Sequence, residues 1–125
     1  MSELRPGLGP LESAVLDVLW KTGTRMSVRE VVEGLEGRRP AYTTVSTVLE
    51  NLRRKGWVDR EQVGRLWFYR PLRDRAAHAA SIMSGALADS GDPHAALLRF
   101  VDEMSAEDVD VLRALLAGIP REEET

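Results

Sequence analysis

The hydrophobic pattern of this chain changes its period near residue 56, and this change constrains the fold most. Before it, three segments repeat apolar residues every three or four positions, which is the stripe of an amphipathic helix. After it, residues 57–71 are rich in β-branched and aromatic side chains, and Gly64-Arg65 divides them. This pattern predicts a β-hairpin with a glycine-containing turn. Because a lone hairpin is marginal in water, we expect it to lie against the helices, as in a winged helix-turn-helix.

Local signals mark the ends of the first three helices. We predict that they span residues 10–21, 28–36 and 43–55. Pro10 suits a first helical position, and Gly23 suits the residue just past a helix end. Ser27 and Glu30 have the spacing of a capping box, in which each side chain satisfies a free backbone donor. Gly56 closes the third helix.

The chain becomes helical again after Pro71. Ala76, Ala80, Met83 and Leu87 form a stripe that ends near Gly91, and Asp92-Pro93 opens a helix through about Glu103. Ser105 caps a last helix that reaches Ile119, and residues 120–125 are predicted to be a frayed acidic tail. The fold class is therefore mainly α with a small β-hairpin. We expect two domains, a winged helix over residues 1–71 and a helical region over residues 72–125.

Charge is unevenly distributed along the 125 residues. Residues 1–71 hold 12 Lys and Arg against 9 Asp and Glu, whereas residues 72–125 hold 5 against 11. Ordinary fluctuation is one explanation, and a polyanion partner for the first half is the other. Without cysteines, a disulfide framework, cysteine-bound zinc and a thiol nucleophile are excluded. No signal peptide and no apolar run of about 20 residues is visible, so we expect a cytoplasmic protein without membrane insertion.

The third predicted helix has the residues for reading DNA. Its apolar stripe is Val45, Val48, Leu49 and Leu52, which leaves a face of small hydroxyls, an amide, Glu50 and an arginine. Short hydroxyls let a helix approach the floor of the major groove, and flanking cations suit phosphates. Arg65 at the hairpin tip can reach a minor groove or a neighbouring backbone. The candidate DNA-binding residues are Arg38, Arg39, Tyr42, Thr43, Thr44, Ser46, Thr47, Asn51, Arg53, Arg54, Lys55 and Arg65.

Other functions have less support in the sequence. Winged helices also dock proteins, and a Thr/Ser face can simply be solvated; the 8 basic against 3 acidic residues between Arg38 and Arg70 argue against docking. A small-molecule sensor needs a pocket, for which we find no clear sequence signature. His78 and His94 have no nearby carboxylate pair or nucleophile, and Asp92 is better explained as a helix cap. We therefore expect no enzymatic activity, cofactor or metal, and we interpret His78 as a surface helix residue.

Three strings resemble the penicillinase repressor family, the BlaI, MecI and CopY type of winged-helix transcriptional repressor. They are LGPLE at residues 8–12, VLDVLW at residues 15–20 and AYTTVSTVL at residues 41–49. The resemblance extends over nearly the whole chain. It implies a homodimer that sits on a pseudopalindromic operator, blocks transcription and dimerises through its C-terminal helices; helices folded back on their own winged helix are the alternative. The candidate interface residues are Ala80, Met83, Leu87, Leu97, Val101, Val109, Leu112 and Leu116.

The resemblance also bears on regulation. In the antibiotic-resistance members a membrane sensor protease triggers cleavage before a phenylalanine, and Arg99-Phe100 matches that place, with Arg99 where asparagine is usual. A core aromatic is the alternative interpretation of Phe100, and we favour it slightly. The copper-responsive members bind metal through C-terminal cysteines, which this chain lacks, so copper sensing of that kind is not expected.

Overall fold

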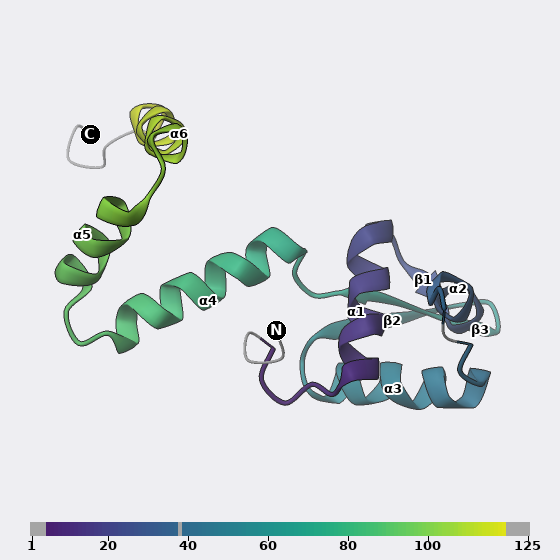
Figure 1. Ribbon diagram of the computed structural model, residues 1–125. Helices are drawn as coiled ribbons and strands as arrows, with labels where there is room; N and C mark the ends of the chain where they lie inside the picture. Colours follow the sequence, from purple (N-terminus) through teal and green to yellow (C-terminus); the bar gives the residue numbers. More distant parts are fainter. Residues whose placement is uncertain (1–4, 38, 120–125) are drawn as a thin grey trace. The chain divides into compact units, whose positions relative to one another are not determined.

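The computed structural model describes residues 5–37 and 39–119, and it has the winged-helix order predicted above (Figure 1). The elements are α1 (Pro10–Thr22), β1 (Met26–Ser27), α2 (Val28–Gly34), α3 (Tyr42–Arg54), β2 (Val58–Val63), β3 (Leu66–Pro71), α4 (Arg75–Asp89), α5 (Pro93–Glu103) and α6 (Ala106–Ala117). Arg38 and the predicted acidic tail lie outside the described residues. The chain forms two compact units, residues 1–82 and 83–125. The domain boundary after residue 71 stays a prediction.

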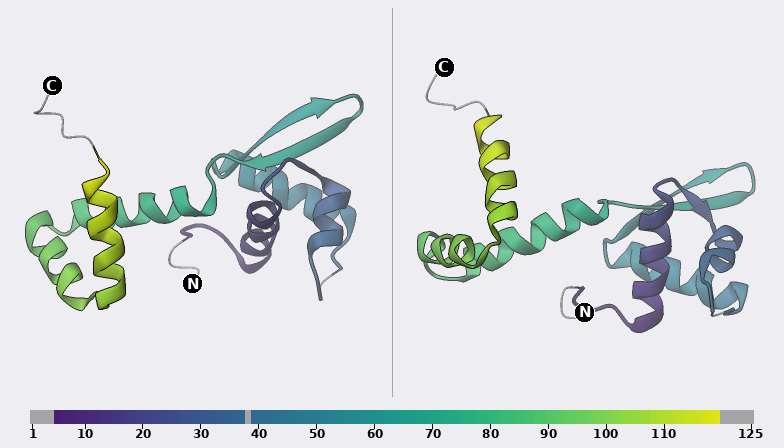
Figure 2. Two further views of the ribbon diagram at one scale, coloured as in Figure 1. Left: turned by 90° about the horizontal axis from the view of Figure 1, so that it is seen from above. Right: turned by 45° about the horizontal axis from the view of Figure 1, so that its top comes forward.

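The sheet has three strands, in the order β1-β3-β2. β2 and β3 form the predicted antiparallel hairpin, which both views of Figure 2 show running to a narrow tip. Gly64 has a φ of +63° at the first position of the two-residue turn, where a type II′ turn needs glycine. The pairing of Met26 with Tyr69 adds β1, which the sequence prediction missed. Two residues are too short to show the alternation that identifies a strand.

The helix ends follow their local signals. Gly9 N–H donates to Glu12 Oε1 at 2.9 Å, and Gly23, at φ +77°, closes α1. The capping box is confirmed: Ser27 N–H donates to the Glu30 carboxylate, and Glu30 N–H donates to the Ser27 hydroxyl. The C-terminal end of α3 is at Arg54, one residue before the predicted end.

The predicted end of α2 at residue 36 is wrong, because the helix stops at Gly34. Leu35 leaves the helix at ψ 78°, and its side chain is buried from the turn instead. A Cβ on Gly34 would lie 2.7 Å from Val18 Cγ1, so the close approach of α1 and α2 requires glycine here. The stripe identified Leu35 as a core residue without revealing that the helix ends first.

The core of the first unit comes from its three helices and the hairpin. Its fully buried side chains are Val15, Leu16, Leu19, Val31, Val45, Leu49, Leu52 and Val58. α1 packs against α3 and β3, and α2 packs against α3, which fixes α3 from its apolar side. In the part of the chain that the structure describes, no side chain of α4, α5 or α6 is buried. The apolar stripes of the later helices are therefore left without a core of their own.

Aromatic contacts hold the start of α4 on the first unit. Trp20 Nε1 donates to the Arg73 carbonyl at 2.8 Å. The His78 ring lies with its centroid 5.4 Å from that of Trp20 and 4.9 Å from that of Trp57. His78 was predicted to be a surface helix residue, and it is half-buried on α4 with its ring close to both indoles. No helix in residues 5–37 and 39–119 has the length and apolar character needed to cross a bilayer.

Candidate nucleic-acid interface

The exposed face of α3 is the face that the sequence predicted. Val45, Leu49 and Leu52 are fully buried and Val48 is 8% exposed, so one side of the helix faces the core. The opposite side has exposed side chains at its N-terminal end and half-buried ones beside them. The exposed residues are Tyr42, Thr43, Thr44 and Thr47, and the half-buried ones are Ser46 and Asn51. Short polar side chains on a protruding face suit close approach to a duplex groove.

A groove of about 440 Å³ separates the N-terminal end of α3 from the hairpin. It brings three predicted residues together, Tyr42 and Ser46 from α3 and Arg65 from the hairpin tip. Arg29 of α2 and Trp67 of β3 also line it, and the sequence analysis did not identify either. Their proximity depends on how the hairpin packs on the helices, which a linear pattern does not reveal.

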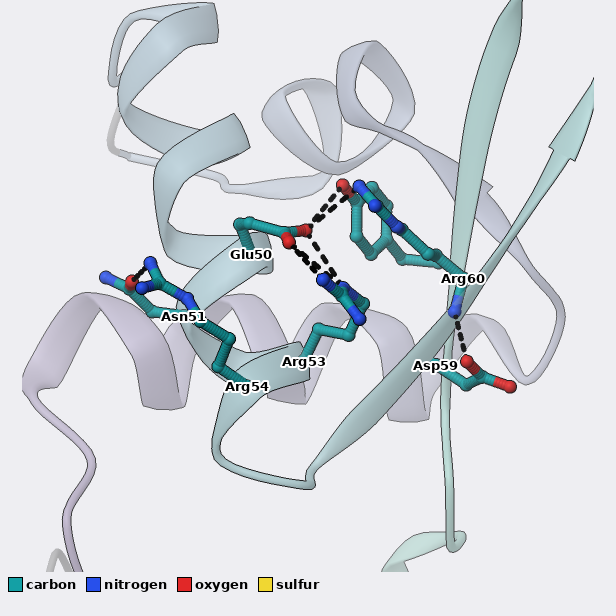
Figure 3. Close-up of polar contacts among 7 residues, drawn as sticks. Glu50, Asn51, Arg53, Arg54, Asp59 and Arg60 are labelled. Atoms are coloured by element: carbon teal, nitrogen blue, oxygen red, sulfur yellow. Dashed lines mark hydrogen bonds and ion pairs between the residues drawn. The ribbon is translucent and has the colours of Figure 1, made fainter.

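The cations around α3 have different surroundings. Arg39 is exposed just before the helix. Arg54 is exposed at its end, and Arg54 Nη2 donates to Asn51 Oδ1 at 2.7 Å (Figure 3). That contact with a neutral amide orients the guanidinium while leaving its charge uncompensated. Arg39, Arg54 and Arg65 are therefore accessible cations, as phosphate contacts require.

The sequence predicted that Glu50 lies on the side of α3 that faces DNA, but the structure places it elsewhere. It is 29% exposed and lies on the flank of α3 that faces the hairpin, where Arg53 and Arg60 both contact its carboxylate (Figure 3). Arg53 Nε donates to Oε1 at 3.0 Å, and Arg60 Nη1 donates to Oε2 at 3.2 Å. Tyr69 adds its hydroxyl at 3.5 Å. The helical period shows correctly that Glu50 lies outside the apolar stripe of α3, but it does not show which flank of the helix the hairpin covers.

These contacts change the titration of the cluster. The hydrogen bonds from Arg53 hold the pKa of Glu50 below its usual value, against a smaller opposing effect of burial. The positive charges of Arg60 and Arg53 also lower the pKa of Glu50. The carboxylate in turn raises the pKa of Arg53. Glu50 is thus ionised at neutral pH, and Arg53, predicted to contact phosphate, is paired within the protein.

Lys55 is paired as well. Its ammonium donates to the Gly7 carbonyl at 2.7 Å and to Glu12 Oε2 at 2.8 Å. Burial of Glu12 acts to raise its pKa, but the bonds from Lys55 and from Gly9 N–H outweigh burial, so the pKa lies below its usual value. Lys55 therefore joins the end of α3 to the start of α1, a role that the sequence analysis did not foresee.

In the C-terminal helices, the predicted interface side chains are accessible in the single chain. Exposed fractions are 60% for Met83, 49% for Leu97 and 61% for Leu116. Val101 and Ala80 are also exposed, and Leu87, Val109 and Leu112 are half-buried. Arg99 and Phe100 lie within α5, and Phe100 is 51% exposed. The favoured interpretation of Phe100 as a core aromatic of this chain is therefore wrong, because the helices around it enclose no core.

Comparison with known proteins finds matches both in sequence and in solved structures. Transcriptional regulator BlaI of Mycobacterium tuberculosis is 44% identical over 116 residues, which cover 90% of this chain and 84% of BlaI. FabT of Streptococcus pneumoniae, solved in complex with DNA, is 22% identical with a TM-score of 0.51 over 93% of this chain and 78% of FabT. The monomeric form of Bacillus licheniformis BlaI, solved with the blaP half-operator, is 28% identical with a TM-score of 0.47 over 57% of this chain and 87% of that one.

The match to a family profile agrees with the strings identified in the sequence. Residues 8–118 match the profile described as Penicillinase repressor, a span that runs from the turn before α1 to the end of α6. The likeness to FabT supports the winged-helix fold, and the identity to BlaI extends over both units. On these grounds the chain belongs to the penicillinase repressor family.

Proposed function

We propose that this chain is a transcriptional repressor that binds double-stranded operator DNA as a homodimer, with α3 of each protomer in a major groove. The observation that carries the proposal is the two-sided character of α3. Its apolar side is buried in the core, while Thr43, Thr44 and Thr47 are exposed. Their neighbours Tyr42 and Ser46 line a groove together with Arg65. A relative with 44% identity is a transcriptional regulator, which supports the same conclusion.

The residues divide into two roles. Thr43, Thr44 and Thr47 contact base edges, because short hydroxyls allow close approach and threonine methyls can touch thymine methyls. Tyr42, Ser46 and Asn51 border this set. The accessible cations Arg39, Arg54 and Arg65 contact phosphates and fix the orientation of the helix. The free backbone amides at the N-terminus of α3 add a further phosphate contact.

Dimerisation accounts for the second unit. α5 and α6 bury no side chain, yet they present Leu97, Val101 and Leu116 along their surfaces. A second copy of the same face satisfies them, and a two-fold dimer matches a pseudopalindromic operator. Two weak half-site contacts then act as one strong contact, so that operator occupancy excludes polymerase. Repression requires access to the chromosome, which places the protein in the cytoplasm.

Regulated proteolysis releases the operator in this proposal, with a membrane sensor protease as the partner. Arg99 and Phe100 are both exposed on α5, so their side chains are accessible to a protease. The surrounding helical turn must unwind before the peptide bond can enter an active site. Co-expression of the chain with the protease encoded nearest to this gene tests for cleavage. A fragment that begins at Phe100 supports cleavage before this residue. A chain that stays intact while repression is relieved rules it out.

Selection from a random-sequence duplex library tests the proposed function as a whole. We expect enrichment of an inverted repeat whose half-sites lie about one helical turn apart. We also expect the logarithm of the association constant to fall linearly with the logarithm of salt concentration, with a slope near −0.9 for each phosphate contacted. A protein-docking module would enrich no sequence and would show little dependence on salt, and either result overturns the proposal.

A further inference from the structure

Glu50 gathers charge at the junction between α3 and the hairpin. Its carboxylate accepts hydrogen bonds from Arg53 Nε at 3.0 and 3.2 Å and from Arg60 Nη1 at 3.2 Å, as Figure 3 shows. Arg53 Nη2 forms a further bond to the same carboxylate. One negative charge therefore serves two guanidinium groups in the most basic part of the sequence.

The contacts join three elements. Glu50 and Arg53 lie one turn apart on α3, Arg60 is on β2, and Tyr69 is directly opposite Arg60 on β3. Tyr69 is 3% exposed, so its ring is fixed in the core while its hydroxyl lies 3.5 Å from the carboxylate. Glu50 therefore anchors the hairpin to the flank of α3 at a defined register.

Both guanidinium groups are restrained by more than one contact. Arg53 engages the carboxylate through two nitrogens, the bidentate arrangement that gives strong charge-assisted bonds. Arg60 is held at its edge by Glu50 and on its face by Trp67, with the guanidinium carbon 4.1 Å from the ring centroid. The Glu50 carboxylate offsets the charge of both guanidinium groups and would repel a phosphate brought beside them.

The other cations near the proposed interface lack such restraint. Within residues 5–37 and 39–119, no carboxylate pairs with Arg39, Arg54 or Arg65. Arg39, Arg54 and Arg65 are thus free to meet phosphates, whereas Arg53 and Arg60 are held by Glu50. The division separates charge that is available to DNA from charge that is used inside the protein.

We propose that Glu50 is a positioning and specificity-determining residue, which withholds Arg53 and Arg60 from DNA phosphates and fixes the hairpin against α3. The inference rests on the proposed function, since it assigns a role in DNA binding. Phosphate contacts add affinity for every sequence alike, whereas base contacts discriminate among sequences. By limiting the phosphate contacts, Glu50 keeps non-specific affinity low, and by fixing the hairpin against α3 it preserves the geometry on which operator contacts depend.

Glu50→Gln tests this role, because glutamine keeps the size of the side chain and removes its charge. Affinity is measured by fluorescence anisotropy over a salt series for two duplexes, the selected operator and the same bases in scrambled order. We expect tighter binding to the scrambled duplex, by roughly eightfold at 0.1 M salt for each guanidinium that gains a phosphate, and a salt slope steeper by about 0.9 each. The phosphate gain is common to both duplexes, so the ratio of operator to scrambled affinity falls only because the hairpin is no longer fixed against α3, which weakens contacts made on the operator.

Glu61→Gln is the matched control. Glu61 is a carboxylate of β2 that, like Glu50, is paired with an arginine, since Arg25 Nη1 lies 2.7 Å from Glu61 Oε1. The change removes the same net charge as Glu50→Gln, but from the hairpin rather than from α3. We expect a wild-type salt slope for this variant. Equal steepening in Glu61→Gln and Glu50→Gln would show a general charge effect and overturn the inference.

Arg60→Gln provides a second measurement that does not depend on the folding of Glu50→Gln. If Glu50 holds Arg60 away from DNA, Arg60→Gln keeps the wild-type salt slope. A slope shallower by about one contact shows that Arg60 already binds phosphate and overturns the inference. Absence of salt-dependent DNA binding by the wild-type chain is a different failure, because it overturns the proposed function itself.

Discussion

At the scale of single residues, Thr47 provides a direct test of base recognition. It lies on the exposed side of α3, opposite the buried Val45 and Leu49. Thr47→Ala should weaken operator binding by roughly 1–3 kcal/mol if a base contact is lost, and should change binding to scrambled DNA much less. Thr47→Ser, which keeps the hydroxyl, separates the hydrogen bond from the methyl contact. Equal losses on operator and scrambled duplexes would remove Thr47 from the set of base-reading residues.

Arg54 provides a test of the proposed phosphate contacts. Its guanidinium is exposed and is oriented by the amide oxygen of Asn51. Arg54→Ala should weaken binding to every duplex alike and reduce the magnitude of the salt slope by about one phosphate. Lys21→Ala is a suitable control, because Lys21 is an exposed cation at the end of α1, outside the proposed interface. An unchanged slope in Arg54→Ala would mean that Arg54 does not bind a phosphate.

Residue-scale prediction succeeded where the helical period decides and failed where tertiary pairing decides. The buried and exposed sides of α3 follow from the spacing of four apolar residues, and both were predicted. Two of the partners of Glu50, Arg60 and Tyr69, lie 10 and 19 positions away, and their approach depends on the register of the hairpin. Lys55 likewise meets Glu12 across 43 positions. No local pattern contains that information.

At the scale of elements, Glu12 and Lys55 connect the start of α1 to the end of α3. Glu12 is 13% exposed, accepts from Gly9 N–H at the helix start and pairs with the Lys55 ammonium. Because folding lowers the pKa of Glu12 from about 4.5, its ionised form stabilises the fold above that pH. This contribution is lost as the pH falls through the lower pKa of the folded state.

Glu12→Gln tests this link between the two helices. We expect the free energy of unfolding to fall by about 1 kcal/mol at pH 7, and the difference from wild type to shrink steadily below about pH 4.5. Urea denaturation followed by tryptophan fluorescence measures both. The matched variant Glu33→Gln changes an exposed carboxylate of α2. A difference that is as large at pH 3 as at pH 7 would show that the ionisation of Glu12 is not its source.

The elements themselves were predicted well, and the exceptions have local causes. Caps at Ser27, Asp92 and Ser105 are confirmed by side-chain bonds to the following backbone N–H groups, because capping depends on residues within one turn. β1 was missed because a two-residue strand is defined by its partner, β3, rather than by its own pattern. α2 ends at Gly34, and Leu35 is buried from the turn that follows, so the apolar stripe runs past the end of the helix.

At the scale of the whole molecule, the two units differ in how much apolar surface they bury. The first unit encloses a core built from α1, α2, α3 and the hairpin, and that core holds the proposed DNA-contacting face in place. The second unit has amphipathic helices with no buried side chain among the residues described. Apolar surface left exposed on a small helical unit favours association, since burial is worth roughly 25 cal/mol per Å².

Leu112→Asp tests whether that association is a homodimer and whether it supports DNA binding. Leu112 is half-buried on the apolar side of α6, and a carboxylate placed there disfavours burial against a second copy. Ala114→Asp adds the same charge about 200° around the helix, on an exposed position, and should remain dimeric. Sedimentation velocity should show monomers only for Leu112→Asp, and a persisting dimer would place the interface elsewhere.

The same pair of variants separates assembly from recognition. A Leu112→Asp monomer retains its α3 surface, so its affinity for a single half-site should match that of Ala114→Asp. On the full operator the monomer should lose the gain that comes from linking two half-site contacts, a factor of roughly 10²–10⁴. If both variants bind the full operator equally well while only one is monomeric, each α3 acts alone, and the helices α4–α6 do not contribute to operator affinity through dimerisation.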